Sequence, residues 1–442
     1  MTDHSHSSRP GFFARLGSGV TRLRNFVLNT LFLILLVVIT AGLLTNCQGV
    51  TVPSNSALLI NPKGVIVESA TLPDPFTNLL SPGPRVAEVE LSAILRAIEE
   101  AATDTDIRMA VLDLDDLAWA APAHAQRIGQ ALQKFRDADK KVVAYGHYYS
   151  QAQYHIASYA DALYMHPMGQ LVFEGYGGFG FYFNELLQNF DVNVHVYRVG
   201  DYKSAVEPLL RNDMSEDARM ASEALYQNIW QHLVGDIATN RRLEPSQVQA
   251  YADDLGAKLA ATAGDMARAA LEAHLVDELL TTDQANVRVA EEVGFADENR
   301  VDVNAIDFES YLLARNLRQP ELGLARNKVA VIVAQGMIVA SGKGGGIVAA
   351  DTTIDLIRRA RQDQSIKAVV LRVDSPGGSQ LASELIRQEL ELQQVSGKPV
   401  VASLAASAAS GGYRISATAD RIVAEPTTIT ASIGIFTFLT TF

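Results

Sequence analysis

The sequence has 442 residues, 48% of them hydrophobic, with 37 basic and 50 acidic side chains and a formal charge of −13 at pH 7. This length allows two or three domains. The acidic balance argues against nucleic-acid binding, which requires a basic surface. A single cysteine, Cys47, excludes both an intramolecular disulfide and a cysteine-based metal site.

The N-terminal segment predicts one membrane anchor. Residues 1–25 contain four arginines, and an uncharged, largely apolar run follows over residues 26–45. This run is long enough to span a hydrocarbon core, and the preceding basic residues place the N-terminus in the cytoplasm and the later domains outside. A cleaved signal peptide is the alternative, but the run ends in Leu43-Leu44-Thr45-Asn46 and lacks the small residues of a cleavage site.

The rest of the sequence contains a weak internal repeat. A displacement of 259 residues places Asp104–Pro167 on Asp363–Pro426 without a gap. Each copy reads as a β-rich run, an amphipathic helix, a buried strand, a second helix and another strand, which predicts an α/β fold with largely parallel sheets. We therefore predict tandem duplicated domains over 56–315 and 325–442. The β-rich run, first helix, buried strand and last strand are expected over 57–68, 91–102, 109–114 and 141–145 in the first copy. In the second copy they are expected over 328–339, 353–361, 368–373 and 399–404.

The second copy is shorter than the first. After Pro167 the first copy continues through a helix-rich region over 215–280, whereas the sequence ends soon after Pro426 in an apolar run. Domains do not usually finish in a hydrophobic strand with no polar tail. We therefore expect the second domain to be incomplete, as in a fragment or a truncated product.

Two differences between the copies point to chemistry in the second one. After its first buried strand the second copy reads Asp374-Ser375-Pro376-Gly377-Gly378, where the first copy has Asp115-Asp116-Leu117-Ala118. A Pro-Gly-Gly turn at the end of a strand leaves bare backbone N–H groups that can stabilise an oxyanion. An ordinary strand-to-helix turn is the alternative interpretation.

The second difference is Ser410, which lies in Ala408-Ala409-Ser410-Gly411-Gly412-Tyr413. The first copy has Gln151 at the corresponding position. A serine at a small-residue turn that opens a helix can expose its hydroxyl as a nucleophile, although it can equally be a helix N-cap. Because both differences occur in the same copy, we favour the nucleophile.

The base that would activate Ser410 is harder to identify. All nine histidines lie at or before His274, so the second copy contains none. A lysine can act as the base if burial or a neighbouring positive charge lowers its pKa. Lys203 follows a predicted strand and precedes a possible helix, which makes it a candidate, although most lysines are solvated surface groups.

Four segments resemble motifs of the long form of the signal peptide peptidase A family. They are Val196–Met214 with its Tyr202–Pro208 core, Leu371–Gly378, Ala408–Tyr413 and Thr430–Ile435. By position, the resemblance implies Ser410 as the nucleophile, Lys203 as the general base and Ser432 as the residue that orients the lysine amine. It implies Gly377 or Gly378 and Gly411 as backbone donors to the oxyanion.

The resemblance also implies the rest of the expected function. The fold would be crotonase/ClpP-like, and the protein a cup-shaped homo-oligomer, a tetramer in the family, with an apolar lining. Its substrates would be signal-peptide remnants or other apolar peptides, cleaved at the bacterial inner membrane by domains on the periplasmic side. It implies no cofactor, no metal and no nucleic-acid partner.

Two departures from the family pattern stand out. The long form usually has Asn where this chain has Asp374, which adds a charge near the expected oxyanion site. Thr437 replaces the usual Gly after Gly434-Ile435-Phe436, and the family's long form continues beyond the last residue of this sequence.

Three other interpretations stay open. A crotonase-like acyl-CoA enzyme would share the fold but need neither Lys203 nor an anchor, and a non-catalytic truncated membrane scaffold would need no dyad. A metalloprotease is disfavoured because the sequence has no His-Glu-x-x-His pair. A pairing of Ser410 with Lys203 distinguishes the protease from all three.

Overall fold

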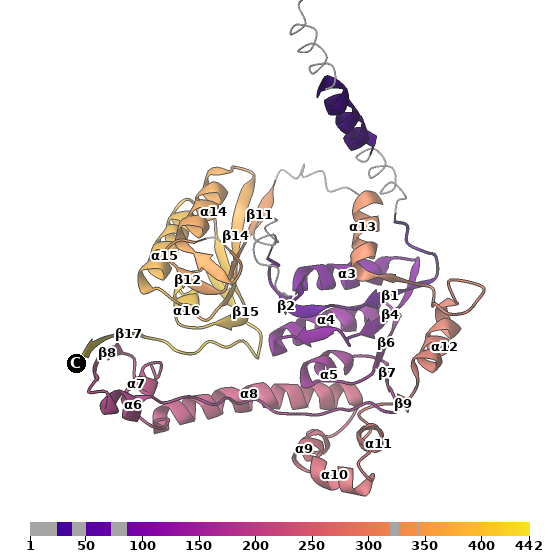
Figure 1. The fold of residues 1–442 in the computed structure, drawn as a ribbon, viewed down its shortest axis with the longest axis horizontal. Helices are drawn as coiled ribbons and strands as arrows, with labels where there is room; N and C mark the ends of the chain where they lie inside the picture. Colours follow the sequence, from indigo (N-terminus) through magenta and orange to yellow (C-terminus); the bar gives the residue numbers. More distant parts are fainter. Residues whose placement is uncertain (1–23, 38–49, 72–85, 319–326, 343) are drawn as a thin grey trace, which may run out of the picture. The chain divides into compact units, whose positions relative to one another are not determined.

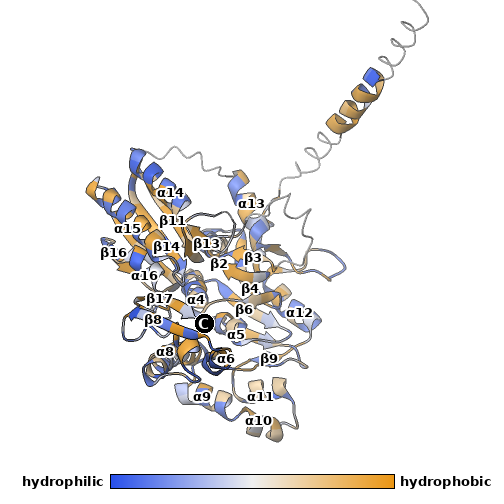
Figure 2. Ribbon diagram, turned by 60° about the vertical axis from the view of Figure 1, so that its left-hand side comes forward, coloured by the Kyte–Doolittle hydropathy of each residue, from blue (hydrophilic) through white to orange (hydrophobic). Residues whose placement is uncertain are grey.

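The computed structural model describes residues 24–37, 50–71, 86–318, 327–342 and 344–442. The chain divides into two units, Met1–Thr51 and Val52–Phe442. In the N-terminal unit the described part includes a helix over 24–37, which is mostly apolar (Figure 2). No helix within the described ranges has the length and hydropathy needed to cross a membrane. The anchor expected over 26–45 extends into residues outside the described ones, where Cys47 also lies.

Val52–Phe442 contains a six-stranded sheet, the first sheet, in the order β10-β1-β4-β6-β7-β9 (Figure 1). Every neighbouring pair in it is parallel. Its central strands are rich in Ala, Val, Leu and Ile and largely buried, as expected for a parallel sheet covered on both faces. The strands are β1 (Ser56–Ile60), β4 (Ile107–Asp113), β6 (Lys141–Gly146), β7 (Ala162–Met165), β9 (Glu278–Leu279) and β10 (Ala305–Asp307).

The second sheet has four parallel strands in the order β11-β14-β15-β16. Its core is continuous with the buried faces of two amphipathic helices, α14 and α15, whose apolar side chains recur every three or four residues. The second sheet and its helices are β11 (Lys328–Gln335), β14 (Ile366–Ser375), β15 (Val400–Ala408), β16 (Arg421–Val423), α14 (Ala350–Gln362), α15 (Gln380–Val395) and α16 (Gly411–Ser416).

Three smaller sheets and a group of helices complete the described structure. β2, β3 and β5 form one parallel sheet, β12 and β13 pair in parallel, and β8 pairs with β17. These strands are β2 (Gly64–Val67), β3 (Glu88–Glu90), β5 (Leu117–Trp119), β8 (Asn193–Val199), β12 (Met337–Val339), β13 (Ile347–Ala349) and β17 (Ile435–Thr441). The helices are α3 (Leu91–Thr103), α4 (Pro122–Asp137), α5 (Gln151–Ala157), α6 (Asn184–Asn189), α7 (Glu207–Leu210), α8 (Glu216–Arg241), α9 (Pro245–Asp253), α10 (Leu255–Ala261), α11 (Met266–Glu272), α12 (Thr282–Val293) and α13 (Phe308–Arg318).

The pairing of β8 with β17 positions the candidate site. The two strands are antiparallel over seven residue pairs, from Ile435↔Val199 to Thr441↔Asn193. Figure 1 shows β8 and β17 together with α6 and α7 near the N-terminal end of the long helix α8. The expectation of an α/β fold with largely parallel sheets is confirmed, and the division into domains over 56–315 and 325–442 stays a prediction.

Candidate active site

Ser410 lies at the turn between β15 and α16 in a strained conformation. Its backbone has φ 49° and ψ −112°, values that a residue with a side chain rarely adopts. Ser410 holds the N-cap position of α16, but its hydroxyl makes no capping hydrogen bond. The N-cap interpretation is therefore insufficient, and the hydroxyl is available for another partner.

That partner is the amine of Lys203. Lys203 is only 4% exposed, and its Nζ lies 3.1 Å from Ser410 Oγ. The same Nζ lies 2.8 Å from the backbone oxygen of Ser432 and 2.9 Å from Ser432 Oγ. The structure thus brings together the three side chains that the family motifs single out, from segments far apart in the sequence.

Two glycines permit the segments that carry Lys203 and Ser432 to come close together at the end of β8. A Cβ on Gly200, which has φ +109°, would lie 2.7 Å from the Ile433 oxygen. A Cβ on Gly434, which has φ +132°, would lie 2.2 Å from the Val199 oxygen. Because neither contact tolerates a side chain, these glycines let the segment that carries Lys203 lie directly against the segment that carries Ser432.

The environment of Lys203 favours a neutral amine. Burial lowers the pKa of Lys203 from its usual value, because a charged ammonium loses hydration there. The Phe436 ring, whose centroid lies 6.0 Å from Nζ, opposes this shift weakly because a ring face attracts a cation. A buried lysine with a lowered pKa can accept a proton at a pH where a solvated lysine cannot.

A cavity of about 630 Å³ opens beside the Lys203–Ser410 pair. Part of its lining is apolar and comes from Val199 and the segment around β17, and part is polar and comes from the start of α15. An apolar cleft with a few polar groups is typical of a site that binds an extended peptide or another apolar ligand. The lining includes Val199, Ser379, Gln380, Ser383, Tyr413, Ile433, Ile435 and Phe436.

The turn after β14 supplies backbone donors next to Ser410. The Gly377 N–H donates to Ser375 Oγ at 3.1 Å, whereas the N–H groups of Gly378 and Gly411 have no partner within the described part of the chain. A Cβ on Gly377 would lie 2.6 Å from Gly411 N and 2.8 Å from Ser410 Cβ. Gly377 therefore allows the close approach, and the N–H groups of Gly378 and Gly411 are left available to bind an anionic oxygen.

The corresponding turn in the first sheet has a structural role. Gln151, which aligns with Ser410, exchanges hydrogen bonds with the backbone of Gly175 at 2.9 and 3.2 Å. Ser150 caps α5 through a capping box with Gln153. The side chains at this turn are thus occupied in holding the loop and helix.

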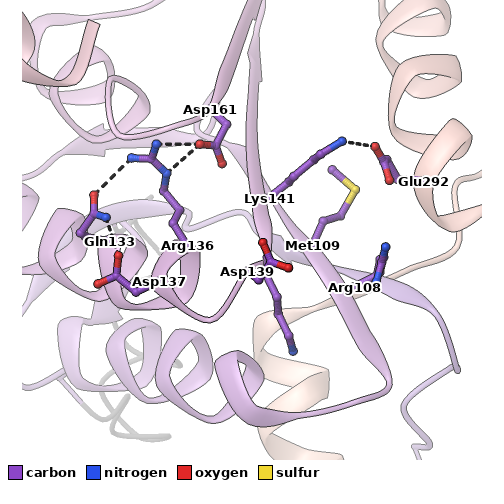
Figure 3. A pocket seen from close by; sticks show the side chains of 10 residues that line it. Arg108, Met109, Gln133, Arg136, Asp137, Asp139, Lys141, Asp161 and Glu292 are labelled. Carbon is purple, nitrogen blue, oxygen red and sulfur yellow. Dashed lines mark hydrogen bonds and ion pairs between the residues drawn. The ribbon is translucent and has the colours of Figure 1, made fainter. Parts of the chain in front are cut away.

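A second cavity of about 620 Å³, next to β4 and β6, is lined mainly by charged side chains. Figure 3 shows that Arg136 binds Asp161 and that Lys141 binds Glu292. Because these charges already neutralise each other, we assign no chemistry to this cavity.

Comparison with known proteins identifies the family. The profile of Peptidase family S49 matches residues 134–296 and 392–442. Protease 4 of Salmonella typhi is 38% identical over 445 residues, which cover 98% of this chain and 70% of that protein. The chain belongs to peptidase family S49. Protease 4 of Haemophilus influenzae is 37% identical over 95% of this chain and 69% of that protein, and the chloroplastic serine protease SPPA of Arabidopsis thaliana is 27% identical over 76% and 49%.

As a member of family S49, the protein is a serine protease that acts on peptides. The resemblance to the signal peptide peptidase A family, given by the four motifs, is confirmed. Sequence reasoning missed the contributions of Gly200, Gly434 and Ser375 to the candidate site. The glycines were visible as small residues beside each motif, but their mutual contact depends on the pairing of β8 with β17, which no local pattern indicates.

Proposed function

We propose that this S49 protease cleaves peptide bonds with a Ser/Lys dyad in which Ser410 is the nucleophile and Lys203 the general base. The observation that carries the proposal is the set of three contacts at Lys203 Nζ. A neutral amine has two N–H groups and one lone pair. With both N–H groups directed to Ser432 O and Oγ, the lone pair faces the Ser410 hydroxyl.

The reaction is an acyl transfer in two halves. Lys203 Nζ takes the proton from Ser410 as Oγ attacks the peptide carbonyl, and the N–H groups of Gly378 and Gly411 stabilise the oxyanion. The C–N bond then breaks, and Lys203 returns the proton to the leaving amine. Water hydrolyses the acyl-serine in the same way: Lys203 takes a proton from the water and gives it to Ser410 Oγ as the ester bond breaks.

For substrates we propose apolar peptides, including signal-peptide remnants. The apolar part of the cavity lining supports this choice. Exposed apolar side chains also occur along β8 and β17, where Tyr197 is 62% and Leu439 61% exposed. Such a surface suits contact with further copies of the chain, and we propose a homo-oligomer, a tetramer by family resemblance.

We further propose an anchored protein with a cytoplasmic N-terminus and periplasmic catalytic domains at the bacterial inner membrane. The basic residues 1–25 and the apolar run over 26–45 support this topology. Tandem crotonase/ClpP-like domains are also part of the proposal. The similar strand orders β1-β4-β6-β7 and β11-β14-β15-β16 support duplication.

The test compares the parent chain with Ser410→Ala and Lys203→Met in detergent, using a leucine ester and a signal-peptide-like peptide. Lys367→Met, a change at an exposed lysine, is the matched control. We expect activity in the parent and the control, and a loss of kcat of about 100-fold or more in the two dyad variants. A Ser410→Ala variant as active as the parent would refute the dyad.

A further inference from the structure

The strand that leads into Ser410 changes register just before the nucleophile. Val373 of β14 pairs with Leu404 of β15, but Ser375 pairs with Ala408, so a step of two residues on β14 faces a step of four on β15. Such a bulge redirects the strand, and bulges are common beside active sites. It also removes regular ladder partners from the bulged residues, whose N–H groups then need other acceptors.

Asp374 supplies one of these acceptors from the opposite strand. Its Oδ1 accepts a hydrogen bond from Ser407 N at 2.9 Å, and its backbone oxygen accepts one from Gly336 N at 2.8 Å. The next residue, Ser375, accepts hydrogen bonds from Ala409 N at 3.0 Å and, through Oγ, from Gly377 N. Asp374 and Ser375 therefore join the strand before the nucleophile to the turn that carries the oxyanion donors.

Arg372, two residues before Asp374 on β14, belongs to a buried group of charges. Arg372 donates to both carboxylate oxygens of Glu68, at 2.8 and 2.6 Å, and to Ser403 Oγ at 2.9 Å. His124, which is 1% exposed, has Nε2 at 3.3 Å from Glu68 Oε1. Glu68 follows β2 and His124 lies on α4, so the part of the chain that carries Lys203 also contributes to the support of the second sheet.

Neighbouring charges and hydrogen bonds oppose the rise in pKa that burial causes in the carboxyl groups of Glu68 and Asp374. Burial alone would raise the pKa of Glu68, but hydrogen bonds and positive charge from His124 and Arg372 lower it to about 2. Burial raises the pKa of Asp374, while the positive charges of His124 and Arg372 and the hydrogen bond from Ser407 oppose that rise.

We propose that Asp374 is a positioning residue: its carboxylate fixes the β15 bulge and thereby holds Ser410 in line with Gly378 and Gly411. The inference rests on the proposed role of Ser410 as the nucleophile. In this role Asp374 needs an oxygen that accepts a hydrogen bond. The role does not need a negative charge facing the substrate.

The test uses Asp374→Asn, which keeps an acceptor oxygen, and Asp374→Ala, which removes it. Asp355→Ala, at an exposed aspartate of α14, is the control. We expect Asp374→Asn and the control to keep kcat within about threefold of the parent, and Asp374→Ala to lose about 100-fold in kcat with KM changed by less than about threefold. Circular dichroism and melting curves establish that each variant is folded at the assay temperature.

A folded Asp374→Ala variant with the parent's kcat would overturn the proposal, as would an Asp374→Asn variant as slow as Asp374→Ala. If Asp374→Ala does not fold, the proposal is tested instead by hydrogen exchange of the segment containing Ser407, measured in the parent and in Asp374→Asn. Slow exchange in both the parent and Asp374→Asn is expected, and rapid exchange in the folded parent would overturn the inference. Failure of the dyad itself is separate, because it appears as full activity in Ser410→Ala whatever happens at Asp374.

Discussion

Replacement of Ser432 by alanine measures how much the orienting hydroxyl contributes to catalysis. Lys203 Nζ has two contacts with Ser432, at 2.8 Å to the backbone oxygen and 2.9 Å to Oγ. Ser432→Ala removes only the second. One hydrogen bond of this kind contributes about 0.5–1.5 kcal/mol, which corresponds to a loss of about two- to twelvefold in kcat.

The expected loss lies in kcat and not in KM, because Ser432 is absent from the described residues that line the cavity. The assay is steady-state hydrolysis of a leucine ester and an apolar peptide, with Lys203→Met as the reference for complete loss of the base. That reference variant should lose about 100-fold to 10,000-fold.

A second variant separates the hydroxyl from the backbone. Ser432 has φ +61°, a conformation that glycine adopts more readily than alanine. Ser432→Gly therefore also lacks the hydroxyl but fits this backbone without strain. We expect both variants to lose the same factor in kcat. A loss in Ser432→Ala as large as that in Lys203→Met would refute the reasoning, since the hydroxyl would then take part in proton transfer, and no loss at all would show that the backbone oxygen alone orients the amine.

The geometry leads to four further predictions. Because the proposed mechanism needs a neutral Lys203, kcat/KM should rise about tenfold per pH unit and level off below pH 10.5, since burial lowers the pKa of Lys203. A plateau reached only above pH 10.5 would contradict this. The same lowered pKa disfavours the folded state while the unfolded lysine is protonated, so Lys203→Met should raise Tm at neutral pH by an amount that shrinks as the pH approaches 10.5. Ser410→Gly should be more stable than Ser410→Ala by about 1 kcal/mol in denaturant titrations, because it relieves the strain at φ 49°, and equal stabilities would argue against strain. Glu68→Gln should lower the free energy of unfolding by about 3 kcal/mol at pH 7. The pKa of Glu68 is about 2 in the folded protein and 4.5 without these interactions, so the parent should lose this stabilisation as the pH falls from 4.5 towards 2. Acid titrations followed by circular dichroism should show this loss in the parent and not in the variant.

Much of the fold could be predicted from local patterns. Apolar spacing predicted a helix over 91–102, and α3 covers Leu91–Thr103 with its apolar face buried. The buried run over 368–373 is the centre of β14 (Ile366–Ser375). Short apolar strands between amphipathic helices were sufficient to predict parallel sheets, because the spacing of apolar residues in helices differs clearly from that in strands in this sequence.

The site was less accessible to sequence reasoning. The serine at a small-residue turn was visible, but no local pattern indicated its strained backbone or the absence of a capping bond. The motifs pointed to Lys203 and Ser432, yet their contact requires the pairing of β8 with β17. The charge of Asp374 looked like a disadvantage for an oxyanion site, since the sequence alone does not reveal that the carboxylate accepts a hydrogen bond from Ser407 N.

The β8–β17 ladder also makes the pairing of Lys203 with Ser410 and Ser432 a late event in folding. A ribosome completes the segment with Lys203 long before it completes the one with Ser410 and Ser432, and seven residue pairs between β8 and β17 must form to join them. Contacts over such a large sequence separation form late in folding. In a nascent or partly unfolded chain Lys203 therefore has no serine beside it, so the dyad proposed above is assembled only in the folded protein.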